Sequence, residues 1–132
     1  MLLFEVYTPT HFYYFSEMRN LIFLPLLCSC IHLQVNAQAI FNLKGEQHML
    51  ITGKGPGQDA TINPFQGKDC YVIVENLGDE SFSVRIQEKL DIVKFITVLP
   101  KEKEQIRLLS TQELYIDSQT IKSTKASVTY KE

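Results

Sequence analysis

The sequence predicts an all-β fold, a small antiparallel β-sandwich of immunoglobulin-like architecture with about seven strands, preceded by a helical signal peptide. Three observations lead to this prediction. Apolar residues alternate with polar ones along most of the chain after Gln47, as in half-buried strands. Turn-forming residues separate these stretches at intervals of about ten residues. No stretch after residue 40 repeats its apolar residues at the helical period.

The N-terminal part of the chain contains an export signal. A positive start lies at residues 18–20, a short apolar core at residues 21–27, and an end of small residues at 35–39. The apolar core is shorter than the roughly 20 residues that a membrane-spanning helix needs. We therefore expect secretion or export to the periplasm, with cleavage after Ala37 or, as the alternative, after Ala39.

Residues 1–17 do not fit such a signal, because they carry two acidic residues and no lysine or arginine. We interpret them as a mis-annotated upstream extension, so that translation begins at Met18 instead of Met1. A different fate is lipid attachment at Cys30, since residues 27–30 loosely resemble a lipoprotein box. Otherwise we expect membrane contact only in transit, through the signal peptide.

With a signal peptide at residues 18–37, residues 38–132 remain as a single β-sandwich domain. Removing residues 1–37 takes away one basic and two acidic residues, so the net charge of −2 becomes −1. Charges of both signs alternate along the domain, which argues against nucleic acid as a partner, because phosphate binding requires clustered basic residues. Only Cys70 remains, so no internal disulfide can form, and its place in an alternating stretch predicts burial.

The alternation places the strands in order along the chain. The expected strands lie at residues 48–51, 60–62, 70–74, 82–86, 92–99, 106–108, 114–116 and 126–130. The stretch 92–99 is long and apolar, so we expect it to be a central strand. Turn residues separate the later strands, and in the turn at residues 76–79 we expect Gly78 to supply a positive φ.

Two loops are candidates for ligand contact, because binding residues concentrate on loops. The first, at residues 53–59, has three glycines and a lysine but lacks the spacing of phosphate-binding or dinucleotide-binding motifs. The second, at residues 63–69, carries an aromatic side chain that is either an exposed platform or a plug for the end of the sandwich. The candidate ligand contacts are Lys54, Gln58, Asp59, Phe65 and Lys68.

Catalytic, metal and cofactor sites are not expected. His48 is the only histidine left after cleavage, and the nucleophile in a His48–Cys70 dyad would be a buried thiol. The acidic residues near the turns lack the spacing of a calcium loop. We therefore expect no enzyme, and we keep an enzyme using His48 and Cys70 only as the opposing hypothesis.

In its size and in the end of its signal, Asn36-Ala37-Gln38, the chain resembles short β-proteins exported by bacteria. That resemblance implies no particular activity. We expect an exported, non-enzymatic interaction module that binds a protein or a glycan through loops at one end. The alternative is an accessory subunit whose sheet edge is completed by a strand of its partner.

Overall fold

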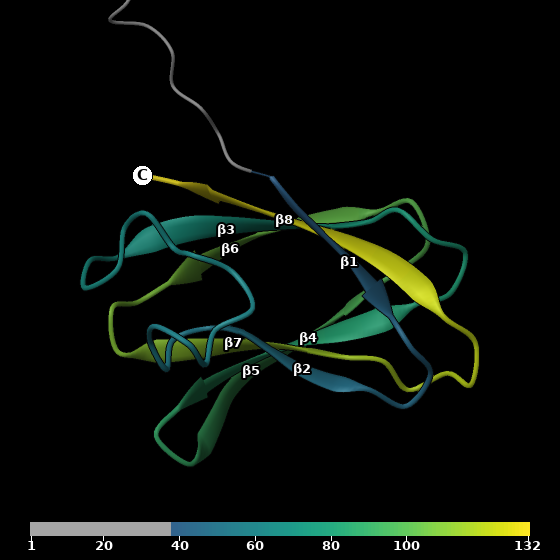
Figure 1. Cartoon of the computed structure of the whole chain (residues 1–132), viewed down its shortest axis with the longest axis horizontal. Helices are drawn as coiled ribbons and strands as arrows, with labels where there is room; N and C mark the ends of the chain where they lie inside the picture. Colours follow the sequence, from purple (N-terminus) through teal and green to yellow (C-terminus); the bar gives the residue numbers. More distant parts are fainter. Residues whose placement is uncertain (1–37) are drawn as a thin grey trace, which may run out of the picture. The chain divides into compact units, whose positions relative to one another are not determined.

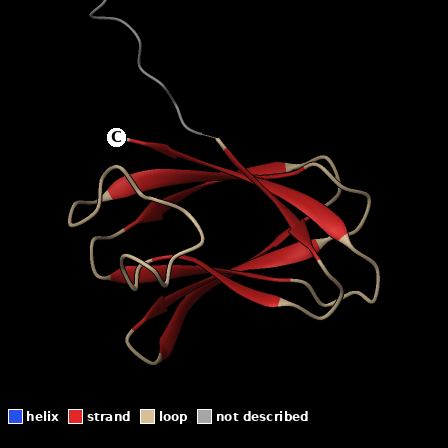
Figure 2. Ribbon diagram, viewed as in Figure 1, coloured by secondary structure: helices blue, strands red, loops and turns tan. Residues whose placement is uncertain are grey.

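The computed structural model describes residues 38–132, which fold into a β-sandwich without a helix (Figures 1 and 2). The strands are β1 (Ala39–Leu43), β2 (His48–Thr52), β3 (Cys70–Asn76), β4 (Phe82–Glu88), β5 (Asp91–Val98), β6 (Lys103–Leu108), β7 (Gln112–Asp117) and β8 (Thr124–Lys131). The all-β prediction is therefore confirmed. The expectations for the extension, the helical signal peptide, its cleavage after Ala37 and the lipidation of Cys30 fall in residues 1–37, outside the described residues.

The strands form two four-stranded antiparallel sheets, in the orders β1-β8-β3-β6 and β2-β7-β4-β5. This order is that of a jelly roll, in which eight strands make two Greek keys. The expected immunoglobulin-like architecture is wrong, because in an immunoglobulin domain the first strand lies beside the second. Here β1 pairs with β8, and β2 lies in the opposite sheet. Residues 38–132 contain eight strands, where about seven were expected.

The core lies between the two sheets and is filled by the apolar members of each alternating strand. On β4, for example, Phe82, Val84 and Ile86 are at most 2% exposed. The other buried apolar residues are Leu43, Ile51, Cys70, Val72, Val74, Val98, Ile106, Leu108, Leu114, Ile116, Ala126, Val128 and Tyr130. The period-two pattern therefore identified the inward faces of most strands.

Two strand expectations are wrong. The stretch 92–99, expected to be central, lies mostly in β5 at the edge of its sheet, and its apolar side chains are largely exposed. Residues 60–62 form no strand. They run as a loop beside the end of β2, where the amide of Thr61 donates to the carbonyl of Ile51 at 3.0 Å. β1 (Ala39–Leu43) was not among the expected strands, which began at residue 48.

Gly78 is required for a reason other than the one the sequence suggested. The glycines with positive φ are Gly53, Gly55, Gly57 and Gly67, and Gly78 is not among them. A Cβ at Gly78 would lie 2.1 Å from Oγ1 of Thr124 and 2.8 Å from the amide nitrogen of Lys125. The turn needs glycine because β8 passes too close to it for any side chain.

Candidate functional site

The β2–β3 loop, residues 53–69, is held by the carboxylate of Asp59. Oδ1 accepts from the amides of Lys54 and Gly55 at 2.9 and 3.0 Å, and Oδ2 accepts from the amide of Gly53 at 3.0 Å and the hydroxyl of Thr52 at 3.2 Å. Three successive amides that converge on one anion form a nest. The glycine-lysine-glycine segment therefore binds an anion, but that anion is a side chain of the same loop.

The chain after Asp59 is fixed by further hydrogen bonds. The Thr61 hydroxyl bonds the Ile51 carbonyl at 3.1 Å and the hydroxyl of Tyr130. Oδ1 of Asn63 accepts from the amide of Phe65 at 2.9 Å, which is the geometry of an Asx turn. The two halves of the loop are thus tied to β2, to β8 and to themselves.

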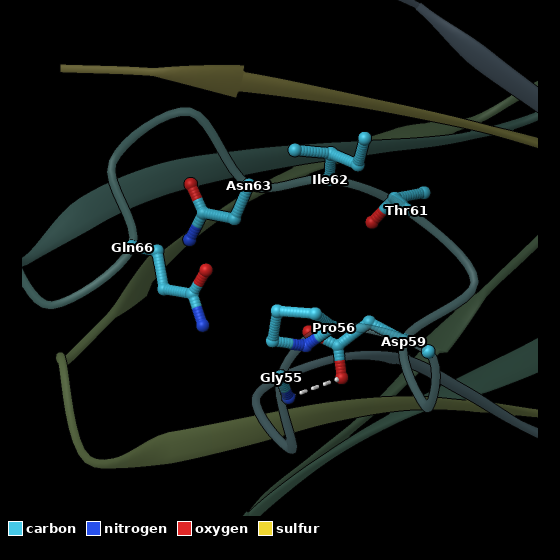
Figure 3. Close-up of a pocket in the computed structure, with 8 residues that line it drawn as sticks. Gly55, Pro56, Asp59, Thr61, Ile62, Asn63 and Gln66 are labelled. Atoms are coloured by element: carbon cyan, nitrogen blue, oxygen red, sulfur yellow. Dashed lines mark hydrogen bonds between the residues drawn. The ribbon is translucent and has the colours of Figure 1, made fainter.

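A pocket of about 180 Å³ lies between the two halves of this loop (Figure 3). Its lining residues are Gly55, Pro56, Gly57, Asp59, Thr61, Ile62, Asn63 and Gln66. In Figure 3 the amides of Asn63 and Gln66 lie on one side of the opening, and Pro56 and Asp59 lie on the other. The carboxylate of Asp59 is turned toward Gly55, so it holds the wall of the pocket in place.

Most polar side chains of this pocket already have partners in the protein. Asp59 is bound to the nest, Thr61 to Ile51 and Tyr130, and Asn63 to Phe65 and weakly to the Cys70 thiol. The Gln66 side chain forms no hydrogen bond with any residue from 38 to 132. Its amide is therefore the polar lining group that remains for a ligand.

The structure brings only part of the expected contact set together. Asp59 lines the pocket, whereas Lys54, Gln58 and Lys68 are exposed and do not line it. Phe65 is half-buried and packs against the core, as a plug instead of an exposed platform. Sequence reasoning missed the lining residues Pro56, Ile62, Asn63 and Gln66. The Asn63-Pro64 turn signal could have pointed to Asn63, but nothing local shows that the loop closes on itself.

Lys54 connects the loop to the outer face of the second sheet. Its Nζ lies 2.8 Å from Oε1 of Glu113 on β7, and this contact raises the pKa of Lys54. Burial by itself would raise the pKa of Glu113, but hydrogen bonds from Lys54 and Tyr115 outweigh it and hold that pKa below its usual value. The Tyr115 hydroxyl donates to Oε2 of Glu113 at 2.8 Å. The lysine expected to meet a ligand is thus held in an ion pair.

The same face carries a nearly buried carboxylate, Asp117. Arg85 donates to both of its oxygens, from Nε at 2.7 Å and from Nη2 at 3.1 Å, and Nδ1 of His48 lies 2.9 Å from Oδ1. The guanidinium of Arg85 also lies over the Tyr115 ring, 4.3 Å from its centroid. Burial alone would raise the pKa of Asp117, but the hydrogen bonds from Arg85 and His48 lower it. These contacts therefore hold the side chains on the outer face of the second sheet to one another.

His48 and Cys70 lie in different surroundings. His48 begins β2 and bonds Asp117 on the outer face, whereas Cys70 begins β3 in the other sheet and is 2% exposed. Burial raises the pKa of the Cys70 thiol, which makes the thiolate scarce. No hydrogen bond joins the two side chains in the part of the chain that the structure describes.

No group of three or more His, Cys, Asp or Glu side chains in residues 38–132 is arranged to hold a metal ion. No helix in the same range has the length and apolar character needed to cross a membrane.

No protein-family model and no curated protein matches the sequence. Two solved structures match this chain. The crystal structure of PirA has a TM-score of 0.55 at 12% identity, and the similarity covers 76% of this chain and 98% of that one. The crystal structure of the Yersinia pseudotuberculosis-derived mitogen has a TM-score of 0.49 at 10% identity, covering 72% and 83%. The similarity to PirA shows a shared all-β sandwich fold.

Proposed function

We propose that this chain is an exported, non-enzymatic interaction module that binds a protein or a glycan through the pocket of the β2–β3 loop. The observation that supports this most is the preformed pocket at one end of the sandwich, where the side-chain amide of Gln66 has no hydrogen-bond partner among residues 38–132. Export rests on the signal-like residues 18–37.

The size of the pocket limits what can enter it. Pockets for complete small ligands usually measure about 300–1,000 Å³, and this one measures about 180 Å³. It therefore suits one group of a larger ligand, such as a single side chain or one sugar ring. Pro56 and Ile62 would contact an apolar face of that group, and the amide of Gln66 would bond a hydroxyl or carbonyl beside it.

The rigidity of the loop favours binding. Flexible loops lose conformational entropy when they bind, and a loop fixed beforehand avoids much of this cost. Here Asp59 holds the first half through Gly53, Lys54 and Gly55, and Thr61 and Asn63 hold the second half. A ligand would meet a wall that is already in place.

This proposal would be tested by measuring how the full chain and three variants bind to a glycan array and to extracellular or periplasmic proteins. Ile62→Asp and Gln66→Ala should each weaken binding at least about tenfold, since they alter an apolar contact and a free amide. Gln58→Ala is the matched control, because Gln58 lies in the same loop but does not line the pocket. Equal binding by all four proteins would refute the pocket as the binding site.

The second candidate is an accessory subunit completed by a strand of another protein, and the outer edge of β1, which pairs with no strand of residues 38–132, favours it. β1 contains no charged residue, no proline and no bulge. The other edges are less suited to pairing with an unrelated strand, because β6 carries Lys103, Glu104 and Arg107, and both β2 and β5 have irregular register. Replacing Ile40 of β1 by lysine should abolish capture of such a partner and leave pocket binding unchanged.

A further inference from the structure

We propose that two copies of this chain associate edge to edge through β5, around a twofold axis between Ile92 and Val93 of each copy. The contact surface is the hairpin patch, defined as Leu90, Ile92, Val93 and Phe95 on the β4–β5 hairpin. The proposal is independent of the pocket function, since the loop at residues 53–69 takes no part in it.

The apolar side chains of the hairpin patch are strongly exposed to solvent. Leu90 is 91% exposed, Ile92 60%, Val93 53% and Phe95 50%, so four of six consecutive residues present apolar surface to solvent. Single exposed apolar residues are ordinary, but a contiguous group marks an interaction surface. Figure 1 shows the β4–β5 hairpin extending away from the rest of the sandwich, where another molecule can reach it.

Two charged side chains lie within this stretch. Asp91 pairs in register with Glu88, and Lys94 pairs with Ile86, which faces the core. Glu88 and Ile86 are two residues apart on β4, so Asp91 and Lys94 project from the same side of the sheet edge. Neither forms an ion pair or a side-chain hydrogen bond within residues 38–132.

The stretch is self-complementary when two copies run antiparallel. With Asp91 opposite Lys94 of the second copy, Lys94 lies opposite Asp91 of the second copy, and both ion pairs form at once. Ile92 then meets Val93, and Phe95 lies across from the β4–β5 turn that carries Leu90, so the apolar residues of the hairpin patch face apolar ones. A twofold interface needs this property, because the same patch serves both partners.

The register shift between Ile86 and Gln87 favours a second copy over a foreign strand. Val93 is the extra residue on β5 at this shift, and such a bulge interrupts regular pairing with an ordinary strand. A second copy brings the same extra residue to the opposite position, so the two irregularities match at the axis. A lysine and a bulge also protect an edge against unrelated strands, which leaves the matched copy as the favoured occupant.

The contact is small, so a weak dimer is expected. Stable interfaces bury about 1,200–2,000 Å², and one hairpin from each copy supplies less than that. The full chain should therefore show a reversible shift from monomer to dimer mass as its concentration rises.

Sedimentation velocity of the full chain, of Asp91→Lys and of Lys94→Asp tests the proposal. Each variant alone places like charges opposite each other twice and should self-associate at least about tenfold more weakly. An equimolar mixture of the two variants should regain dimer at the wild-type level, because the mixed dimer again has two opposite-charge pairs. The positions are exposed, and circular dichroism checks that each variant is folded.

Several results would overturn the proposal. A wild-type chain that stays monomeric at all concentrations would show that Lys94 and the bulge keep this edge free. A dimer unaffected by either charge reversal would place the contact elsewhere, residues 1–37 included. Mixing that restores nothing would exclude the antiparallel alignment. If Asp91→Lys and Lys94→Asp lose the dimer but still bind ligand at the β2–β3 loop, the dimer contact is separate from the proposed binding function.

Discussion

Replacing Asp59 by alanine should destabilise the β2–β3 loop and the domain. The carboxylate accepts four hydrogen bonds, and bonds to a charged acceptor contribute about 1.5–3 kcal/mol each. The amides of Gly53 and Lys54 are exposed and can bond water instead, whereas Gly55 is buried and its amide would be left without a partner. We therefore expect the free energy of unfolding to fall by about 2–4 kcal/mol, well below the sum of the four bonds.

Urea denaturation of Asp59→Ala, Asp59→Asn and Gln58→Ala measures this effect. Asparagine keeps one acceptor oxygen for Lys54 and Gly55 but cannot accept at the other position, so it should lose about half as much as alanine. Gln58→Ala changes the exposed residue next to Asp59, and its free energy of unfolding should stay within about 0.5 kcal/mol of that of the wild type. Amide hydrogen exchange at Gly55 should accelerate in the alanine variant. If Asp59→Ala and Gln58→Ala unfold alike, and Gly55 stays protected, the reasoning is refuted.

Three further predictions concern the outer face, the core and the β3–β4 turn. Asp117→Asn should cost about 2–3 kcal/mol, because Arg85 loses its carboxylate partner. The folded-state pKa of Asp117 is lowered, so its contribution is present above about pH 4 and is lost as the pH falls further; urea titrations should show this acid-dependent part missing in the variant. The Cys70 thiol, buried and with a raised pKa, should react with a disulfide reagent far more slowly in the native protein than in urea, and equal rates would contradict its burial. Gly78→Ala should cost about 1–3 kcal/mol in thermal or urea unfolding, since its Cβ would meet Thr124, and an unchanged stability would mean that β8 moves aside freely.

The inward faces of the strands could be predicted because burial on one side of a sheet imposes a period of two on the sequence. Phe82, Val84 and Ile86 follow this rule and are buried. The rule fails for β5, where Ile92, Val93 and Phe95 are apolar and exposed. A run of apolar residues fits either a strand buried on both faces or an edge strand whose apolar side chains are exposed. The sequence does not distinguish these two cases.

The candidate site could be predicted only as a region. Glycines and a proline indicated an irregular loop after β2, and the pocket is there. Which side chains line it depends on the nest around Asp59, and that nest uses three amides brought together by the fold of the loop. For this reason Lys54, Gln58 and Lys68 were expected at the site, while Ile62 and Gln66 were missed.

The sequence by itself determined the all-β class, most strand positions and the burial of Cys70, because these follow from local alternation and turn residues. Tertiary structure decided the rest. Pairing of β1 with β8 makes the chain a jelly roll, and no local pattern specifies a partner more than 80 residues away. The same long-range pairing places β5 at an edge, and so turns an expected core strand into an exposed hairpin patch.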